Sequence, residues 1–120
     1  MRAKDRTGLL GEEFAAAYLE RRGHTVLERR WRVRRGEIDL ITSDGGILVA
    51  VEVKTRRGLG YGHPLEAVGE EKLRRLHRLM LDYLAHHGML AASHRVDVVS
   101  VLIRGKGAEP RIEHLEDVPR

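Results

Sequence analysis

Apolar side chains in the first part of this chain recur at the spacing of an amphipathic helix. The pattern runs from about Gly8 to Arg22, and Gly23 is a natural stop for a helix. One apolar stripe combines Leu10, Phe14, Ala17 and Tyr18, and it is widened by Ala15, Ala16 and Leu19. We therefore predict a first helix that packs one face against the rest of the fold.

A second helical pattern occupies the middle of the chain. It begins near Pro64, a residue favoured at the start of helices, and continues to about His87, where Gly88 ends it. Gly69 could divide this helix in two. The apolar stripe consists of Leu65, Val68, Leu73, Leu76, Leu79, Met80, Tyr83 and Leu84. The preceding residues 55–64 are rich in glycine and are predicted to form a loop.

Segments with strand character fill most of the remaining chain. Residues 24–31 predict one strand, 37–54 a hairpin, 95–103 a strongly β-prone strand and 111–115 an edge strand. Residues after Glu116 are expected to form a tail. The second helix can act as a crossover to a parallel strand. The order of elements predicts a single α/β domain over residues 1–120, with a mixed β-sheet, an acidic antiparallel hairpin and flanking helices.

The predicted hairpin has a polar and an apolar face. Side chains of a strand point alternately to the two faces of a sheet. In the first strand, Glu37, Asp39 and Ile41 are therefore expected on one face, and Ile38 and Leu40 on the other. In the second strand, the side chains of Glu52 and Lys54 are expected on one face, and those of Val49, Val51 and Val53 on the other.

A two-residue turn at Gly45-Gly46 sets the predicted pairing of the hairpin. Counting outward places Asp39 opposite Glu52, and Glu37 opposite Lys54. Two opposed carboxylates repel each other unless a divalent cation lies between them. The lysine could hold a phosphate or a water beside that cation, or it could simply pair with Glu37. The first arrangement has the composition needed to hydrolyse a phosphodiester.

Composition and charge narrow the classes of function. The net charge of +4 and the pI of about 9.8 are compatible with an acidic partner, although basic surfaces also occur without one. The absence of cysteine excludes disulfides, thiolate metal sites and a cysteine nucleophile. No apolar run reaches the roughly 20 residues of a membrane span, and no apolar signal core begins the chain. We expect a cytoplasmic protein that does not bind membranes.

The motifs GEIDLI at residues 36–41 and VEVKTR at 51–56 resemble the YraN-like family of small bacterial proteins. The likeness covers nearly the whole chain and includes Gly11-Glu12 and the late segment RVDVV at residues 95–99. That family is similar to the PD-(D/E)xK nucleases and, within them, to archaeal Holliday-junction resolvases. The resemblance implies a restriction-endonuclease-like core. Ile38 stands where the nuclease pattern often has a proline.

The resemblance also implies roles for individual residues. Asp39, Glu52 and the backbone carbonyl of Val53 match the groups that bind Mg²⁺ or Mn²⁺ in these nucleases. Lys54 matches the catalytic lysine, and Glu12 matches a glutamate of the first helix that often joins the site. Candidates for contact with nucleic acid are Arg34, Arg35, Arg56, Arg57 and Lys72, and Glu37 is a further candidate for the site.

Three hypotheses for the function remain open at this stage. The first is a magnesium-dependent endonuclease (a hydrolase) that acts on branched or damaged DNA in repair or recombination, where symmetric cutting of a junction would require a homodimer. The second is a nucleic-acid-binding or assembly protein on the same fold that does not cut. The third is a structural sheet protein whose basic surface is incidental. Asp97 lies in an apolar strand and is predicted to pair with an arginine rather than to act in a site.

Overall fold

The computed structural model describes residues 3–58 and 68–120, which form one mixed sheet with two helices. The strand order is β1-β2-β3-β4-β5, and neighbours are antiparallel except for β3 and β4, which are parallel. The elements are α1 (Ala3–Arg21), β1 (Thr25–Val33), β2 (Gly36–Asp44), β3 (Ile47–Arg57), α2 (Glu70–His86), β4 (His94–Ile103) and β5 (Arg111–Leu115). The predicted α/β class and mixed sheet are confirmed.

The second helix is shorter within the described residues than the sequence predicted. It begins at Glu70, and Gly69 is its N-cap residue in an extended conformation. The predicted start near Pro64 and the stripe residue Leu65 lie outside the described residues, as do residues 59–64 of the predicted loop. The loop was wrong for residues 55–57, which extend β3. No helix in the described part of the chain is long and apolar enough to cross a membrane.

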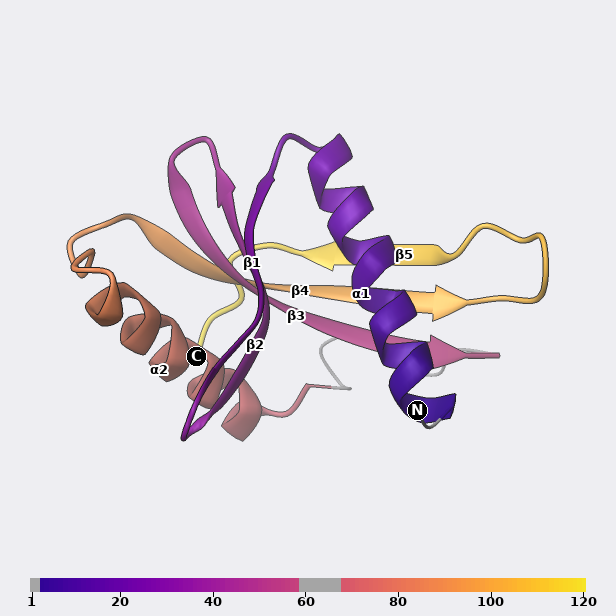
Figure 1. Ribbon diagram of the computed structural model, residues 1–120, viewed down its shortest axis with the longest axis horizontal. Coiled ribbons are helices and arrows are strands. Elements are labelled where there is room, and N and C mark those ends of the chain that lie inside the picture. The colour runs from indigo at the N-terminus through magenta and orange to yellow at the C-terminus, as the bar shows by residue number, and fades with distance from the viewer. Residues whose placement is uncertain (1–2, 59–67) are drawn as a thin grey trace.

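The two helices cover opposite faces of the sheet (Figure 1). In β3, Val49 and Val51 pack in the cluster under α1, whereas Leu48 and Ala50 pack in the cluster under α2. A sheet that is covered on both faces needs apolar residues at successive positions. This requirement explains why the centres of β3 and β4 are almost continuously apolar in the sequence.

The first helix packs through small side chains. Ala15, Ala16 and Leu19 are fully buried, whereas Leu10 is 39% exposed and Phe14 is only partly buried. Phe14 and Tyr18 of the predicted stripe pack at the border of the cluster under α1, but its centre is the face that was expected only to widen the stripe, and Leu10 lies outside it. Alanines at this face allow the helix to lie close to the sheet.

Gly11 marks the closest approach of α1 to β3. A Cβ atom at this position would lie 2.6 Å from Cγ2 and 2.7 Å from Cβ of Thr55. We expect Gly11→Ala to lower the free energy of unfolding by about 1–3 kcal/mol, because the overlap outweighs the better helix propensity of alanine. Urea denaturation measures this change. Gly8→Ala is the matched control, since its Cβ meets open space, and equal stability of the two variants would contradict the prediction.

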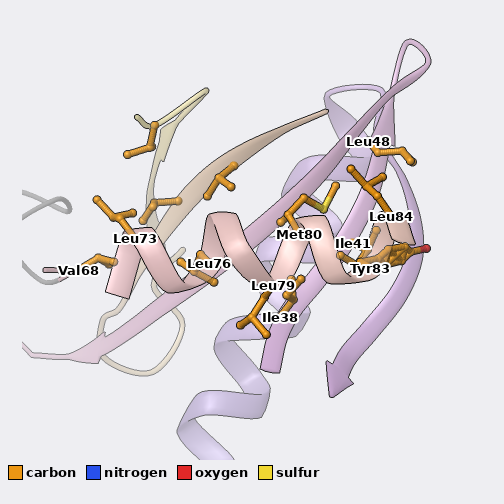
Figure 2. Packing of buried hydrophobic residues seen from close by; sticks show 14 residues of the cluster. Ile38, Ile41, Leu48, Val68, Leu73, Leu76, Leu79, Met80, Tyr83 and Leu84 are labelled. Carbon is orange, nitrogen blue, oxygen red and sulfur yellow. The ribbon is translucent and has the colours of Figure 1, made fainter. Parts of the chain in front are cut away.

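The second helix buries a continuous apolar stripe against the sheet (Figure 2). The stripe is formed by Leu73, Leu76, Leu79, Met80, Tyr83 and Leu84. Leu79 packs beside Ile38 of β2, and Tyr83 and Leu84 lie near Ile41. The helix is thereby fixed over the end of β2 that carries the acidic motif.

The last residues of the chain have no regular secondary structure, but they contact the core. Val118 is buried in the cluster under α2. Its backbone N–H donates to the carbonyl of Val96 at 2.7 Å, and its carbonyl accepts a hydrogen bond from Nε2 of His77 at 2.8 Å. The segment expected to be a tail therefore docks against β4 and α2.

Asp97 of β4 is buried within a network of hydrogen bonds. Nε of Arg95 lies 2.9 Å from Oδ1, Nε2 of His114 lies 2.8 Å from Oδ2, and the backbone N–H of Asp117 donates to Oδ1 at 2.9 Å. Burial alone would raise the pKa of Asp97, but these hydrogen bonds lower it below its usual value. The predicted pairing with an arginine is confirmed, and Asp97 has a structural role.

Candidate active site

The hairpin of β2 and β3 is regular only near its turn. Asp44 faces Ile47, as the Gly45-Gly46 turn predicted, and the ladder ends where Leu40 faces Val51. Beyond that pair, β2 continues beside β1, while β3 continues beside β4. Figure 1 shows β1 and β2 turning away together from β3 and β4. Among the described residues, no strand therefore borders this edge of β3 from Glu52 onward.

The backbone is irregular where the two strands separate. The β1–β2 ladder skips the pair that Arg30 and Asp39 would form, and Arg30 adopts a left-handed φ of +50°. Ile38 and Ile41 both pack under α2, whereas Leu40 packs under α1. The predicted sharing of one face by Ile38 and Leu40 was wrong, because the alternation of side chains is interrupted at Asp39.

Asp39 and Glu52 converge at the open edge of β3. Both carboxylates line the same two hollows, and Oδ2 of Asp39 accepts a hydrogen bond from the Val53 N–H at 2.8 Å. Burial, together with the charge of Glu52, raises the pKa of Asp39 to about 8. The N–H and C=O of one strand residue point to the same side. The Val53 carbonyl is therefore expected to face this edge as well.

Two acidic side chains of the site are paired with cations in this structure. Nζ of Lys72 lies 2.6 Å from Oε2 of the buried Glu52, and Nη1 of Arg30 lies 2.7 Å from Oε1 of Glu12. Lys72 was predicted to contact nucleic acid, and here it neutralises Glu52 from the first turns of α2. A divalent cation that binds Glu52 would have to displace the Lys72 ammonium.

Lys54 lies in the same hollow without a partner. It makes no hydrogen bond or ion pair with any described residue, and it is half-buried. The alternative pairing of Lys54 with Glu37 was wrong, because the β2–β3 ladder ends before that pair. Oε1 of Glu37 instead lies 3.4 Å from Nη2 of Arg32. The ammonium of Lys54 is therefore available to a bound molecule.

A hollow of about 460 Å³ brings most of the predicted site together. Its walls come from α1, β2, β3 and the start of α2. Among the residues that line it are Glu12, Asp39, Glu52, Val53, Lys54, Arg56, Arg57 and Lys72. Nε of Arg57 donates to Oγ1 of Thr7 at 2.8 Å, so that this arginine is held at the rim by α1.

Arg34 and Arg35 are not part of this hollow. They line a separate hollow of about 170 Å³ with Asp82 and His86, and Nε of Arg35 lies 3.8 Å from Oδ2 of Asp82. Their closeness in sequence to Asp39 favoured a place beside the acidic cleft. The turn between β1 and β2 instead carries them toward the C-terminal half of α2.

Two features of the site were not predicted from the sequence. The left-handed Arg30 as the partner of Glu12 has no local sequence signal, because a non-glycine residue rarely adopts this conformation. Arg75 was not among the predicted site residues, although it lines a hollow that adjoins the acid pair. The spacing of Lys72 and Arg75 by three residues, on one side of a helix, was the available signal.

The donor set fits a hard divalent cation that keeps several waters. In the described part of the chain, no three His, Cys, Asp or Glu side chains could hold a metal ion together. Two carboxylates with one backbone carbonyl are, however, the kind of partial oxygen site that Mg²⁺ uses. The charge of Glu12, which lines the same hollow, also contributes to the raised pKa of Asp39.

Comparisons with known proteins place the chain among relatives of the same length. The model of the "Uncharacterised protein family UPF0102" matches residues 11–101. A UPF0102 protein of Arthrobacter sp. (strain FB24) is 53% identical over 98% of this chain and 99% of its own length. A UPF0102 protein of Renibacterium salmoninarum is 51% identical over 96% of this chain and 97% of its own length. One of Rhodococcus jostii is 49% identical over 92% of each chain.

Proposed function

This chain belongs to the uncharacterised protein family UPF0102, and on that premise we propose that it is a metal-dependent endonuclease that hydrolyses phosphodiester bonds in DNA. The observation that supports this function most is the convergence of Asp39 and Glu52 at the open edge of β3. The unpaired Lys54 and the basic rim of the same hollow support it further. The proposed core is that of the restriction-endonuclease-like fold.

Asp39, Glu52 and the carbonyl of Val53 would hold Mg²⁺ or Mn²⁺. When bound, the cation supplies positive charge that stabilises the transition state of phosphoryl transfer. The backbone N–H of Val53 fixes the orientation of Asp39 by donating a hydrogen bond to Oδ2. Arg30 fixes Glu12 in the same way from β1.

Lys54 would act on the phosphate itself. Its ammonium can donate a hydrogen bond to the attacking water or to a phosphate oxygen, and it thereby orients the nucleophile and stabilises the added negative charge. Arg56 and Arg57 at the rim would bind neighbouring phosphates of the backbone, a contact that carries little sequence information. We therefore expect DNA to be recognised by its backbone and shape.

The ion pairs of the site favour one second candidate. Lys72 neutralises Glu52 and Arg30 neutralises Glu12 without any metal, which is compatible with a protein that binds nucleic acid or assembles with partners and does not cut. This alternative predicts DNA binding that is indifferent to Asp39→Asn and to divalent metal. The nuclease predicts cutting that depends on both.

The direct test is a cutting assay on single-stranded, linear duplex, flapped and four-way DNA with Mg²⁺ or Mn²⁺. We expect metal-dependent cutting of at least one substrate by the parent and none by Glu52→Gln. Symmetric cutting of four-way DNA would in addition imply a homodimer. Binding without cutting in both metals would favour the second candidate as a nucleic-acid-binding protein. The absence of both binding and cutting would exclude the nuclease and the nucleic-acid-binding protein.

The Lys72–Glu52 ion pair predicts that metal and lysine compete. We expect Lys72→Met to tighten the binding of Mn²⁺ by about threefold to tenfold, because the cation no longer has to displace an ammonium worth about 1 kcal/mol. Calorimetric titration at constant pH measures the affinity. Arg74→Met is the matched control, because Arg74 is an exposed cation further along α2. It should leave the affinity for Mn²⁺ unchanged. Weaker binding in Lys72→Met would show that the lysine assists the metal.

A further inference from the structure

A second hollow of about 220 Å³ adjoins the candidate site on the side of α2. It shares Asp39, Glu52 and Lys72 with the larger hollow and continues between the start of β2 and the helix. The acid pair therefore lies at the junction of two hollows. A polymer whose reacting bond is held at this junction would extend into both.

Arg75 supplies an available cation to the second hollow. It is exposed, and its guanidinium makes no hydrogen bond or ion pair with any described residue. Two neighbouring cations are already in ion pairs. Lys72 is paired with Glu52, and Nη2 of Arg32 lies 3.4 Å from Oε1 of Glu37. A free guanidinium at the rim of a hollow is suited to bidentate contact with phosphate oxygens.

The space beside Arg75 is kept open by a glycine. Leu76 and Leu79 of α2 form the buried floor of the hollow, and Gly36 of β2 adds no side chain. A Cβ atom at Gly36 would lie 3.3 Å from Cδ1 of Leu79 and would narrow the space between strand and helix. The hollow thus leaves room for part of a nucleotide beside a cation for a phosphate.

We propose that this second hollow is a nucleotide subsite in which Arg75 binds the phosphate next to the one that is cut. The subsite lies on the side of the acid pair away from Arg56 and Arg57, which line only the larger hollow. The inference rests on the proposed nuclease function and specifies which bonds of a DNA strand would be cut. One DNA strand would run through both hollows, so that the bond cut must have a phosphate on each side and terminal bonds are poor substrates.

The test compares Arg75→Ala with Arg78→Ala in binding a 12-nucleotide oligothymidylate without divalent metal. Fluorescence anisotropy gives the affinity over a series of salt concentrations. We expect Arg75→Ala to weaken binding at low salt by about fivefold to tenfold and to reduce the slope of log K against log salt by about 0.7, the value for one phosphate of a single strand. Arg78 lies one turn further along α2, is exposed, lines neither hollow and has no partner in the described residues. We therefore expect Arg78→Ala to weaken binding of the oligonucleotide by less than about twofold.

The outcomes separate the subsite from the function on which it rests. A parent protein that binds the oligonucleotide, with equal affinity and slope in the two variants, would overturn the subsite and leave the proposed nuclease intact. A parent that binds neither the oligonucleotide nor duplex or four-way DNA at low salt would remove both. Thermal melts of the two variants, expected to match the parent because both positions are exposed, establish that a loss of binding is not a loss of folding.

Discussion

Lys54→Ala is expected to slow the cutting of DNA by at least about a hundredfold and to change its binding by less than about threefold. The ammonium is unpaired in the site, and removing one group that stabilises charge in a transition state typically slows the chemical step by a factor of about 10²–10³. The measurement is the single-turnover rate at saturating protein, with affinity from anisotropy.

Arg57→Ala is the matched control for Lys54→Ala, because it removes a cation from the rim of the same hollow. Its guanidinium is held by Thr7 of α1, where it can contact the backbone beside the bond that is cut. We expect this variant to weaken binding and to flatten the salt dependence, with the rate at saturation preserved. Cutting by Lys54→Ala at the rate of the parent would show that the proposed mechanism is wrong.

Asp39→Asn is expected to stabilise the metal-free protein near pH 8 and to remove the response to metal. Asp39 has a pKa of about 8 in the folded protein, raised by burial and by Glu52 from an ordinary value of 3.8. Between these two values the folded protein retains a proton that the unfolded chain has released. The contribution of Asp39 to the free energy of unfolding therefore falls as the pH rises through this window.

Asparagine removes this pH dependence because it carries no charge, and its oxygen can still accept the hydrogen bond from Val53. We expect Asp39→Asn to gain about 1–3 kcal/mol of stability at pH 8 and much less at pH 5, since one unit of pKa corresponds to about 1.4 kcal/mol. Urea denaturation at pH 5, 7 and 8 in a chelator measures the difference between parent and variant.

Glu37→Gln is the control for this experiment, because Glu37 lies in a surface pair with Arg32. Its stability should follow that of the parent at every pH. Millimolar Mn²⁺ should raise the melting temperature of the parent and of Glu37→Gln, but not that of Asp39→Asn, because a ligand that binds only the folded state stabilises it. A difference between parent and Asp39→Asn that is independent of pH would contradict the assigned role of burial.

The sequence predicted the features that depend on neighbours along the chain. The Gly45-Gly46 turn is short and has positive φ at both glycines, so it fixed the register near Asp44 correctly. Asp39 and Glu52 do line the same hollows, as expected, but the ladder ends one pair before the position at which they were predicted to face each other. The apolar surroundings of Asp97 likewise required a partner, and Arg95 provides it.

The features that failed depend on tertiary packing. The turn cannot indicate where β2 leaves β3, because that point is set by β1 on one side, β4 on the other and the helices on the two faces. The alternation that the pattern assumed is interrupted in β2 at Asp39, so that Ile38 packs under α2 and Leu40 under α1. For the same reason, the sequence placed Glu37 opposite Lys54, whereas the strands have already parted at that level.

The measurement that tests the metal site most directly is a crystal structure of the protein with Mn²⁺, with anomalous diffraction recorded from the metal. We predict one peak within about 2.5 Å of carboxylate oxygens from both Asp39 and Glu52 and of the Val53 carbonyl. We also predict that Nζ of Lys72 has moved away from Oε2 of Glu52, to which it now lies at 2.6 Å. No peak between the two carboxylates at millimolar Mn²⁺, with the Lys72–Glu52 pair intact, would contradict the proposed metal-dependent site.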